Sequence, residues 1–502
     1  MDFAVNAIAE GRVLVPWEHQ NFPNMTIQDS SKGIEHVFGG KFIPDWTENE
    51  STWEAWRRTC PPDTPARRLF SSRRNPFASK QTPDYISLAS SDVPAEEQKK
   101  STAIKPGSDF KFMSSTNTNV DFCLHPHMHT DQGHFFSDWR SIPALYPVFT
   151  PARSQGFMDI RIPSHYYYGS TLRYTYGWDP INLEFRDVDP MEVPWEDKLD
   201  KVFWRGATTG GGSHPPGFSP QYQRHRFLHM TSLSTSHSPP PPPPPPPSTD
   251  PSSTNRFITF ADPLNPNRYV TAPVPMANLN DEIMDVAFVK SVAARTYPGG
   301  EEALRRDHRF GDAVPLGEHW KYKYLVDLDG MSYSGRFLAL LASDSVPVKS
   351  TIYEEWFSDW IQPWCVFFCS FFQKKKERTI FDVWIRVHFI PLSTTYREIY
   401  NIVAYFSGPT PSMLLAANSS LPSMTMLSEE EEEKEEEEGE EEEYAREALQ
   451  DQEALRREQK ELASVEADRR LKRIARAGKE WKRTMGRKVD MEGELCLFAC
   501  CS

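Results

Sequence analysis

Cysteine is scarce in this sequence, and no pair of cysteines is accompanied by the further ligands of a zinc site. Seven are present among 502 residues: Cys60 and Cys123 are isolated, and the others are Cys365, Cys369, Cys496, Cys500 and Cys501. This usage excludes a zinc-finger or a disulfide-scaffold fold. A disulfide between Cys60 and Cys123 stays open, because it would need an oxidising compartment.

Long apolar runs are missing too. The longest, WCVFFCSFF at residues 364–372, is far shorter than the roughly 20 residues that cross a bilayer. The first residues lack the basic and then apolar pattern of a secretory signal. Three N-glycosylation triplets, at Asn24, Asn49 and Asn418, nevertheless favour a secretory lumen. We therefore expect a lumenal protein whose membrane anchor lies outside this sequence.

The sequence has no excess of basic charge. Lys and Arg number 56 against 70 Asp and Glu, a net charge of −14 at pH 7. Much of this acidity is local, because residues 429–443 contain 13 glutamates. The charge indicates neither a nucleic-acid partner nor a basic membrane-binding surface. Residues 426–443 have no apolar face and repel one another, which predicts a disordered acidic run.

Aromatic residues are abundant. They make up 13% of the chain and include 14 Trp, which predicts a packed globular body. Residues 231–255 interrupt it with low complexity, including nine consecutive prolines from Pro239 to Pro247. We interpret this segment as a polyproline-II insert on the surface, with a ligand for SH3 or WW domains as the alternative.

Residues 324–350 carry the clearest secondary-structure pattern. YLVDL predicts a strand, GRFLALLAS a helix and SVPVK a second strand. Such a βαβ unit is typical of a parallel sheet in an α/β fold. Residues 201–204 predict a further strand, and residues 396–407 a helix. Residues 444–490 predict a long charged helix, which lacks the sustained heptads of a coiled coil.

A polar turn, DGMSYSGR, follows the YLVDL strand. In an open α/β sheet, ligands bind outside the carboxyl ends of the strands, which is where this turn lies. Gly330 permits a tight turn, Ser332 and Ser334 offer hydroxyl groups, and Arg336 begins the following helix. A guanidinium at this place suits a phosphate. The alternative is an ordinary glycine turn.

A second turn with the same chemistry is WRGATTGGG. Arg205 follows the strand at 201–204, and Gly206, Thr208 and Thr209 offer backbone and hydroxyl donors. Neither turn is a Walker loop or a GxGxxG fingerprint, so each taken alone is also compatible with a purely structural role.

Five motifs occur in a fixed order: KVFWRGATTGG, YQRHRF, EHWKYKYLVDLDGMSYSGRFLALLASDSVPVK, YEEWFSDWIQPW and HFIPL. Together they closely resemble glycosyltransferase family 90, which includes fungal capsule-associated β-1,2-xylosyltransferases and animal protein O-glucosyltransferases. The resemblance implies an α/β fold of GT-B type, with two Rossmann-like domains facing a cleft and a charged C-terminal helix. Residues 1–200 would form the acceptor-side domain and residues 201–425 the domain that binds the nucleotide sugar.

The resemblance also implies an activity, which is inverting transfer of a sugar from a UDP-sugar to a hydroxyl of a glycan or glycoprotein. Xylose is the expected sugar, and the lumen of the Golgi or endoplasmic reticulum is the expected location. Ser334 and Arg336 match a serine–arginine pair at the donor diphosphate. Arg205 matches an arginine that faces the nucleotide, and Gly206 and Thr208 share its turn. Glu355, preferred over Glu354, would bind the ribose.

Asp327 and Asp329 spell the Asp-x-Asp metal motif of a different fold, GT-A. A GT-B enzyme stabilises the leaving diphosphate with arginine and helix dipoles instead, so we expect no metal, with a divalent cation as the alternative. We expect one aspartate to cap the following helix or to brace Arg336.

The general base is harder to place. Inversion needs a group that takes the proton of the acceptor hydroxyl. The position where the glucosyltransferase branch has an aspartate holds another residue here, which leaves Asp131 and His125 as candidates. Asp159, in GFMDIRIP, matches a family element and would bind sugar or acceptor.

Residues 365–386 interrupt a family motif, because deleting them restores PWVHFIPL. We interpret them as the product of a retained intron. If they are real, they lie beside the donor site and put activity in doubt. The alternative function is therefore a catalytically inactive member of the family, or an interaction protein that uses the acidic and helical C-terminal region.

Overall fold

The computed structural model describes the chain over several ranges. These are residues 191–209, 219–234, 255–261, 269–330, 333–363, 387–420, 465–487 and 489–491, with short pieces at 13–14, 63–68, 123–125, 132, 140–141, 149–154, 160–164 and 167. The catalytic candidates Asp131 and Asp159 and the insert at residues 365–386 lie outside these ranges.

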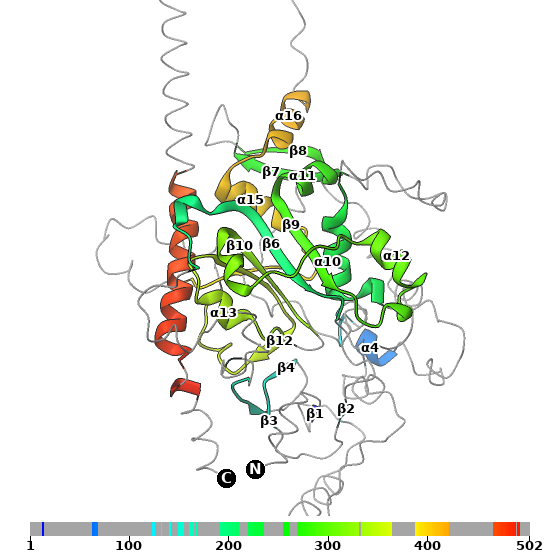
Figure 1. The fold of residues 1–502 in the computed structure, drawn as a ribbon, viewed down its shortest axis with the longest axis vertical. Helices are drawn as coiled ribbons and strands as arrows, with labels where there is room; N and C mark the ends of the chain where they lie inside the picture. The colour runs from blue at the N-terminus through cyan, green and yellow to red at the C-terminus, as the bar shows by residue number, and fades with distance from the viewer. Residues whose placement is uncertain are drawn as a thin grey trace, which may run out of the picture.

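A parallel five-stranded sheet is the centre of the described structure (Figure 1). Its strands are β6 (Leu199–Ala207), β9 (Met284–Lys290), β10 (Tyr322–Leu328), β11 (Val346–Ser350) and β13 (Ile390–Pro391). Every pairing is parallel, in the order β13-β11-β10-β6-β9. The predicted α/β class is thereby confirmed, and the parallel sheet is compatible with a Rossmann-like fold.

The strand order has a functional consequence. The first strand, β6, has the second, β9, on one side and the third, β10, on the other. In the order of the chain this is 2-1-3-4-5, a doubly wound arrangement in which the connections change direction between β6 and β10. Ligands of such sheets bind at the carboxyl ends of the strands at that switch point.

Side chains alternate between the two faces of β10, as in any strand. Tyr324, Val326 and Leu328 join the largest core cluster, whereas Leu325 packs with Phe203 on the opposite face. Both faces are covered, so the strand is a nearly continuous apolar run, as parallel sheets require.

Helices cover both faces. On the first face lie α10 (Gln223–Ser232), α11 (Met276–Ile283) and α15 (Ile399–Ser407), whose apolar residues share a core with Val326. On the second face lies α13 (Phe337–Leu341), whose Leu340 packs on Phe203. The predicted βαβ unit is therefore β10–α13–β11, and the helix expected at 396–407 is α15, which begins three residues later.

A hairpin that the sequence did not predict flanks the proline-rich insert. It consists of β7 (Asn255–Ala261) and β8 (Tyr269–Pro275), which pair antiparallel. Figure 1 shows it beside α11, α15 and α16 (Pro411–Ser420). The backbone N–H of Thr259 donates to Oδ1 of Asn401 at 2.8 Å, which ties the hairpin to α15.

The C-terminal part of the chain packs against this sheet domain. Residues 465–485 are helical and form the red helix of Figure 1, whereas residues 444–464 lie outside the described ranges. Leu471 and Ile474 enter the main core, and Trp481 enters a second core beside α13. A Cβ on Gly478 would lie 2.6 Å from the carbonyl oxygen of His388, so glycine permits this close approach.

The remaining elements are short. They are β1 (Val13–Leu14), α4 (Pro65–Arg68), β2 (Arg140–Ser141), β3 (Phe149–Thr150), β4 (Ala152–Ser154), β5 (Ile160–Arg161), η5 (Trp195–Asp197), η6 (Ser219–Gln221), η8 (Ala294–Thr296), α12 (Gly300–Asp307), η9 (Leu316–Lys321) and β12 (Tyr353–Glu355). The pair β4–β12 is antiparallel and joins the N-terminal region to the segment after β11.

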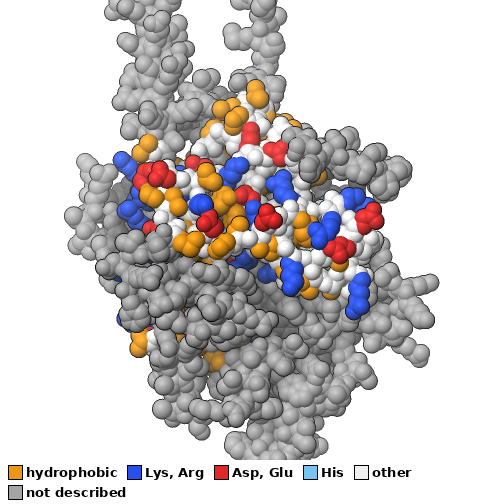
Figure 2. All heavy atoms as spheres, in the orientation of Figure 1, with side chains coloured by type: hydrophobic (Ala, Val, Ile, Leu, Met, Phe, Trp, Pro, Cys, Tyr) orange, Lys and Arg blue, Asp and Glu red, His pale blue; other side chains and the backbone are white. Residues whose placement is uncertain are grey.

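The predicted acceptor-side domain, residues 1–200, lies mostly outside the described ranges, and so does the acidic run at 426–443. Cys123 is disulfide-bonded, although the described residues do not include the proposed partner Cys60. None of the described helices combines the length and the apolar character needed to cross a bilayer. Acidic and basic side chains alternate over the described surface in the view of Figure 2.

Candidate functional site at the ends of β6 and β10

Arg336 lies at the switch point of the sheet. It is the N-cap residue of α13, and its Nη1 donates to the carbonyl oxygen of Arg205 at 2.6 Å. Its guanidinium lies 5.7 Å from the centre of the Trp204 ring. No carboxylate of the described residues forms an ion pair with Arg336, so the expectation that Asp327 or Asp329 braces it is wrong.

Arg224 approaches the same indole from α10, on the other face of the sheet. Its guanidinium lies 5.5 Å from the Trp204 ring, and its Nε donates to the carbonyl oxygen of Asp329 at 3.0 Å. Its Nη1 donates to Oγ1 of Thr209 at 2.8 Å. Arg224 therefore connects the ends of β6 and β10. We call Arg224 and Arg336 the arginine pair.

Arg224 belongs to the motif YQRHRF but was not among the predicted site residues. A signal was present, because Arg224 and Gln223 begin a helix whose later residues Phe227 and Leu228 are core. Gln223 also donates, from Nε2 to the carbonyl oxygen of Gly330 at 2.7 Å. Polar residues that start such a helix hold the β10 turn in place.

The guanidinium of Arg205 is bound to Asp285. Its Nη2 forms an ion pair with Oδ1 of Asp285 at 2.5 Å, and its Nη1 donates to the Asp285 carbonyl oxygen at 2.8 Å. Tyr322 donates to the same carboxylate. Burial opposes ionisation of Asp285, but the bonds from Tyr322 and Arg205 bring its pKa below the usual value. Arg205 thus contacts Arg336 through its backbone, while its side-chain charge is neutralised by Asp285.

Gly206 and Thr208 shape the β6 turn. A Cβ on Gly206 would lie 2.5 Å from the Trp204 ring, so the glycine makes room for the indole under the arginine pair. Thr208 Oγ1 accepts from the backbone N–H of Val292 at 2.8 Å and lies 3.1 Å from the Val292 carbonyl oxygen. This hydroxyl, predicted as a ligand donor, therefore binds the turn that follows β9.

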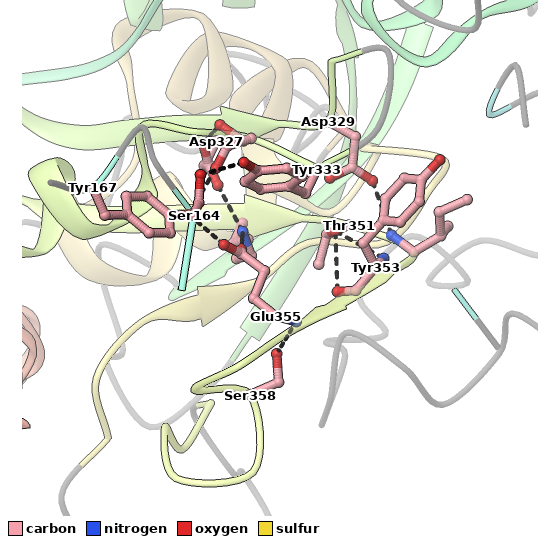
Figure 3. A network of polar contacts seen from close by, with 12 residues as sticks. Ser164, Tyr167, Asp327, Asp329, Tyr333, Thr351, Tyr353, Glu355 and Ser358 are labelled. Carbon is pink, nitrogen blue, oxygen red and sulfur yellow. Dashed lines mark hydrogen bonds and ion pairs between the residues drawn. The ribbon is translucent and has the colours of Figure 1, made fainter. Parts of the chain in front are cut away.

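Ser334 and Glu355 belong to a buried polar network, of which Figure 3 labels Tyr167, Asp327 and Glu355. Nζ of Lys349 lies 2.8 Å from Oδ2 of Asp327 and 3.2 Å from Oε1 of Glu355. Ser334 donates to the other oxygen of Asp327, and Tyr167 donates to the other oxygen of Glu355. We call these five residues the Lys349 network. It occupies the atoms of Ser334 and Glu355 that were predicted to contact the donor.

Burial sets the charges in and around this network. Although burial opposes it, the carboxylates of Asp327 and Glu355 raise the pKa of Lys349 above its usual value. Burial raises the pKa of Glu355, against the attraction of Lys349. Burial also raises the pKa of Asp329 to about 7, although Lys349 opposes this shift. Oδ2 of Asp329 accepts the backbone N–H of Ile352 at 3.0 Å.

The Asp-x-Asp pair is thus used for structure. Asp327 binds Lys349 and Ser334, and Asp329 holds the turn between β11 and β12. The ranges that the structure describes contain no group of three or more His, Cys, Asp or Glu side chains placed to hold a metal ion. Neither aspartate caps α13, whose N-cap makes no side-chain bond.

The predicted catalytic groups are only partly described. His125 is exposed, two residues after the disulfide-bonded Cys123. Asp131 and Asp159 fall outside the described residues, although their neighbours Gln132 and Ile160 are included.

A scan of the chain against models of protein families found no match, and a search of curated proteins found none either. The functional assignment therefore rests on the motifs of the sequence and on the side chains at the ends of β6 and β10.

Proposed function

We propose that the chain is an inverting glycosyltransferase that moves a sugar, with xylose as the expected one, from a UDP-sugar to a hydroxyl of a glycan or glycoprotein. The observation that carries the proposal is the arginine pair over Trp204 at the switch point of the sheet. The order of the five family-like motifs supports it, because two of them contain Arg224 and Arg336.

The chemistry of the site agrees with a diphosphate leaving group. Negative charge grows on the diphosphate as the glycosidic bond breaks, and preorganised cations lower the energy of that state. Guanidinium groups bind phosphate oxygens in a bidentate manner without a metal ion. Carbonyl oxygens hold both arginines in position, and such neutral partners leave the charge of Arg336 available to a ligand.

The proposed enzyme also needs a second domain, a general base and a compartment. Residues 1–200 would supply the second Rossmann-like domain of a GT-B enzyme, with the general base among Asp131, His125 and Asp159. The disulfide at Cys123 supports a secretory lumen, because such bonds persist in oxidising compartments. The expected location is the lumen of the Golgi or endoplasmic reticulum.

Titration calorimetry with UDP tests the assignment of the arginine pair. We expect Arg336→Ala to raise the Kd for UDP about a hundredfold, the usual effect of losing a charge-assisted contact to a phosphate. Arg336→Lys should also bind weakly, because lysine keeps the charge but not the bidentate geometry. Arg305→Ala is the control, since Arg305 is an exposed arginine paired with Glu301.

Two outcomes would contradict the proposal. The first is a wild-type protein that does not bind UDP. The second is an Arg336→Ala variant that keeps the wild-type Kd and still transfers sugar.

A second function, a UDP-binding protein without transferase activity, is favoured by one observation. Side chains of Arg205, Ser334 and Glu355, all predicted to contact the donor, are held by other residues of the chain. Incubation with a panel of UDP-sugars separates the two functions, since only the enzyme releases UDP. An interaction role for the C-terminal region would concern residues 426–464, because the helix at 465–485 packs into the cores.

A further inference from the structure

His319 is a buried histidine whose imidazole makes no hydrogen bond to the residues that the structure describes. It lies in η9, just before β10, and its side chain is 5% exposed. Its ring packs on Phe203 at 4.7 Å between ring centres and meets Trp320 edge to face at 6.3 Å. None of the described residues donates a hydrogen bond to the imidazole or accepts one from it. Buried polar side chains nearly always have a partner, and the ring nitrogens of His319 are not among the fully enclosed unpaired atoms of the described residues, so a ligand can reach them.

The surroundings of His319 connect it to the proposed donor site. Burial lowers its pKa to about 3, and the charges of Arg336 and Arg205 act in the same direction. Arg205 also lies over Phe203, the ring on which His319 packs. The imidazole is therefore uncharged at neutral pH. Its contacts lead to Arg336 through Phe203 and then Arg205, whose carbonyl oxygen accepts from Nη1 of Arg336 at 2.6 Å.

We propose that His319 binds a hydroxyl group of the donor sugar, next to the diphosphate held by the arginine pair. This inference rests on the proposed function. A neutral imidazole has one donor and one acceptor nitrogen, which matches a hydroxyl group that both donates and accepts. Phosphate oxygens only accept, and arginine suits them better. His319 is thus a residue that determines which sugar is bound.

The experiment compares the affinities for UDP and for UDP-xylose, with UDP-glucose as a second donor. His319→Phe keeps an aromatic ring against Phe203 but has no polar atom. We expect it to weaken binding of the UDP-sugar about tenfold, the effect of one lost hydrogen bond, and to leave the Kd for UDP within twofold. His319→Asn, which keeps a donor and an acceptor, should recover part of the loss. His229→Phe, on the exposed side of α10, is the matched control.

The outcomes separate this inference from the function on which it rests. If the wild-type protein does not bind UDP, the proposed function fails. If it binds UDP and UDP-xylose, but His319→Phe weakens both equally or neither, the role of His319 is wrong and the UDP site stands. If His319→Phe does not fold, the same comparison is made with His319→Asn, where a loss confined to UDP-sugars supports the inference and an equal loss contradicts it.

Discussion

Two cations close to the carboxyl ends of β10 and β11 have opposite surroundings. Lys349 is buried and binds the carboxylates of Asp327 and Glu355. Arg336 is half-buried and donates to a backbone carbonyl oxygen. The charge of Lys349 is neutralised inside the protein, whereas that of Arg336 has no counter-ion among the described residues. We therefore expect a ligand at Arg336, whose partner is neutral, and a structural role for Lys349.

The difference predicts two kinds of mutational effect. Removing Lys349 leaves two buried carboxylates without their cation, and this should change the stability of the fold. Removing Arg336 leaves a carbonyl oxygen and an indole ring, and this should change ligand binding more than stability.

The largest effect on folding is expected for Lys349→Met. Breaking a buried ion pair by removing one partner costs about 3–5 kcal/mol of the free energy of unfolding, because the remaining charge is buried and unpaired. Denaturant unfolding measures this loss. Adding Asp327→Asn and Glu355→Gln to Lys349→Met should restore much of the stability, since no unpaired charge is then left. A single variant as stable as the wild type would show that Lys349 is not the centre of the network.

Asp329 should give the next largest effect, and one that depends on pH. Its pKa of about 7 in the folded protein lies above the value of about 3.9 in an unfolded chain. Between these values the folded state binds the extra proton, so stability falls as the pH rises, by up to about 1.4 kcal/mol per pH unit. Above pH 7 Asp329 is ionised in both states, so stability no longer changes with pH through this group and stays at its lowered value.

The matched variant is Asp329→Asn, which resembles the protonated carboxyl group and can still accept from Ile352. Wild type and variant should have similar stability near pH 4, and the variant should become the more stable protein as the pH approaches 8. Unfolding curves at pH 4.5, 6 and 8 measure the difference. A constant difference across this range would mean that Asp329 is ionised in the folded protein throughout.

The sequence was sufficient for the parts of the site that lie close together along the chain. β10, α13 and β11 follow one another within residues 322–350, and their apolar periods and glycine turn fixed their order. Arg336 was found by its place after that turn. The alternation of strands and helices also predicted the parallel sheet.

Contacts between distant residues could not be predicted in this way. Arg224 and Asp329 are 105 positions apart, and Arg205 and Asp285 are 80 apart. Their meeting depends on the strand order, which the local pattern does not contain. One contact could have been predicted from the sequence, because Asp327 and Lys349 are direct neighbours in the parallel register of β10 and β11. That pairing accounts for Asp327, one of the two aspartates of which we expected one to cap the helix or to brace Arg336.

The smallest effect is expected for Arg205, and it sharpens the comparison most. Arg205 is an arginine at the end of β6, yet it resembles Lys349 in having a carboxylate partner, Asp285. If neutral partners mark the ligand-binding cations, Arg205→Ala should change the Kd for UDP less than threefold, against about a hundredfold for Arg336→Ala.

Asp285→Asn should then lower stability slightly, by no more than about 1 kcal/mol, since the ion pair is partly exposed. Calorimetry on the two arginine variants under one set of conditions measures the contrast. Equal losses of UDP affinity would mean that Arg205 leaves Asp285 when the nucleotide binds, and Asp285→Asn, which frees the guanidinium beforehand, would then bind UDP more tightly than the wild type.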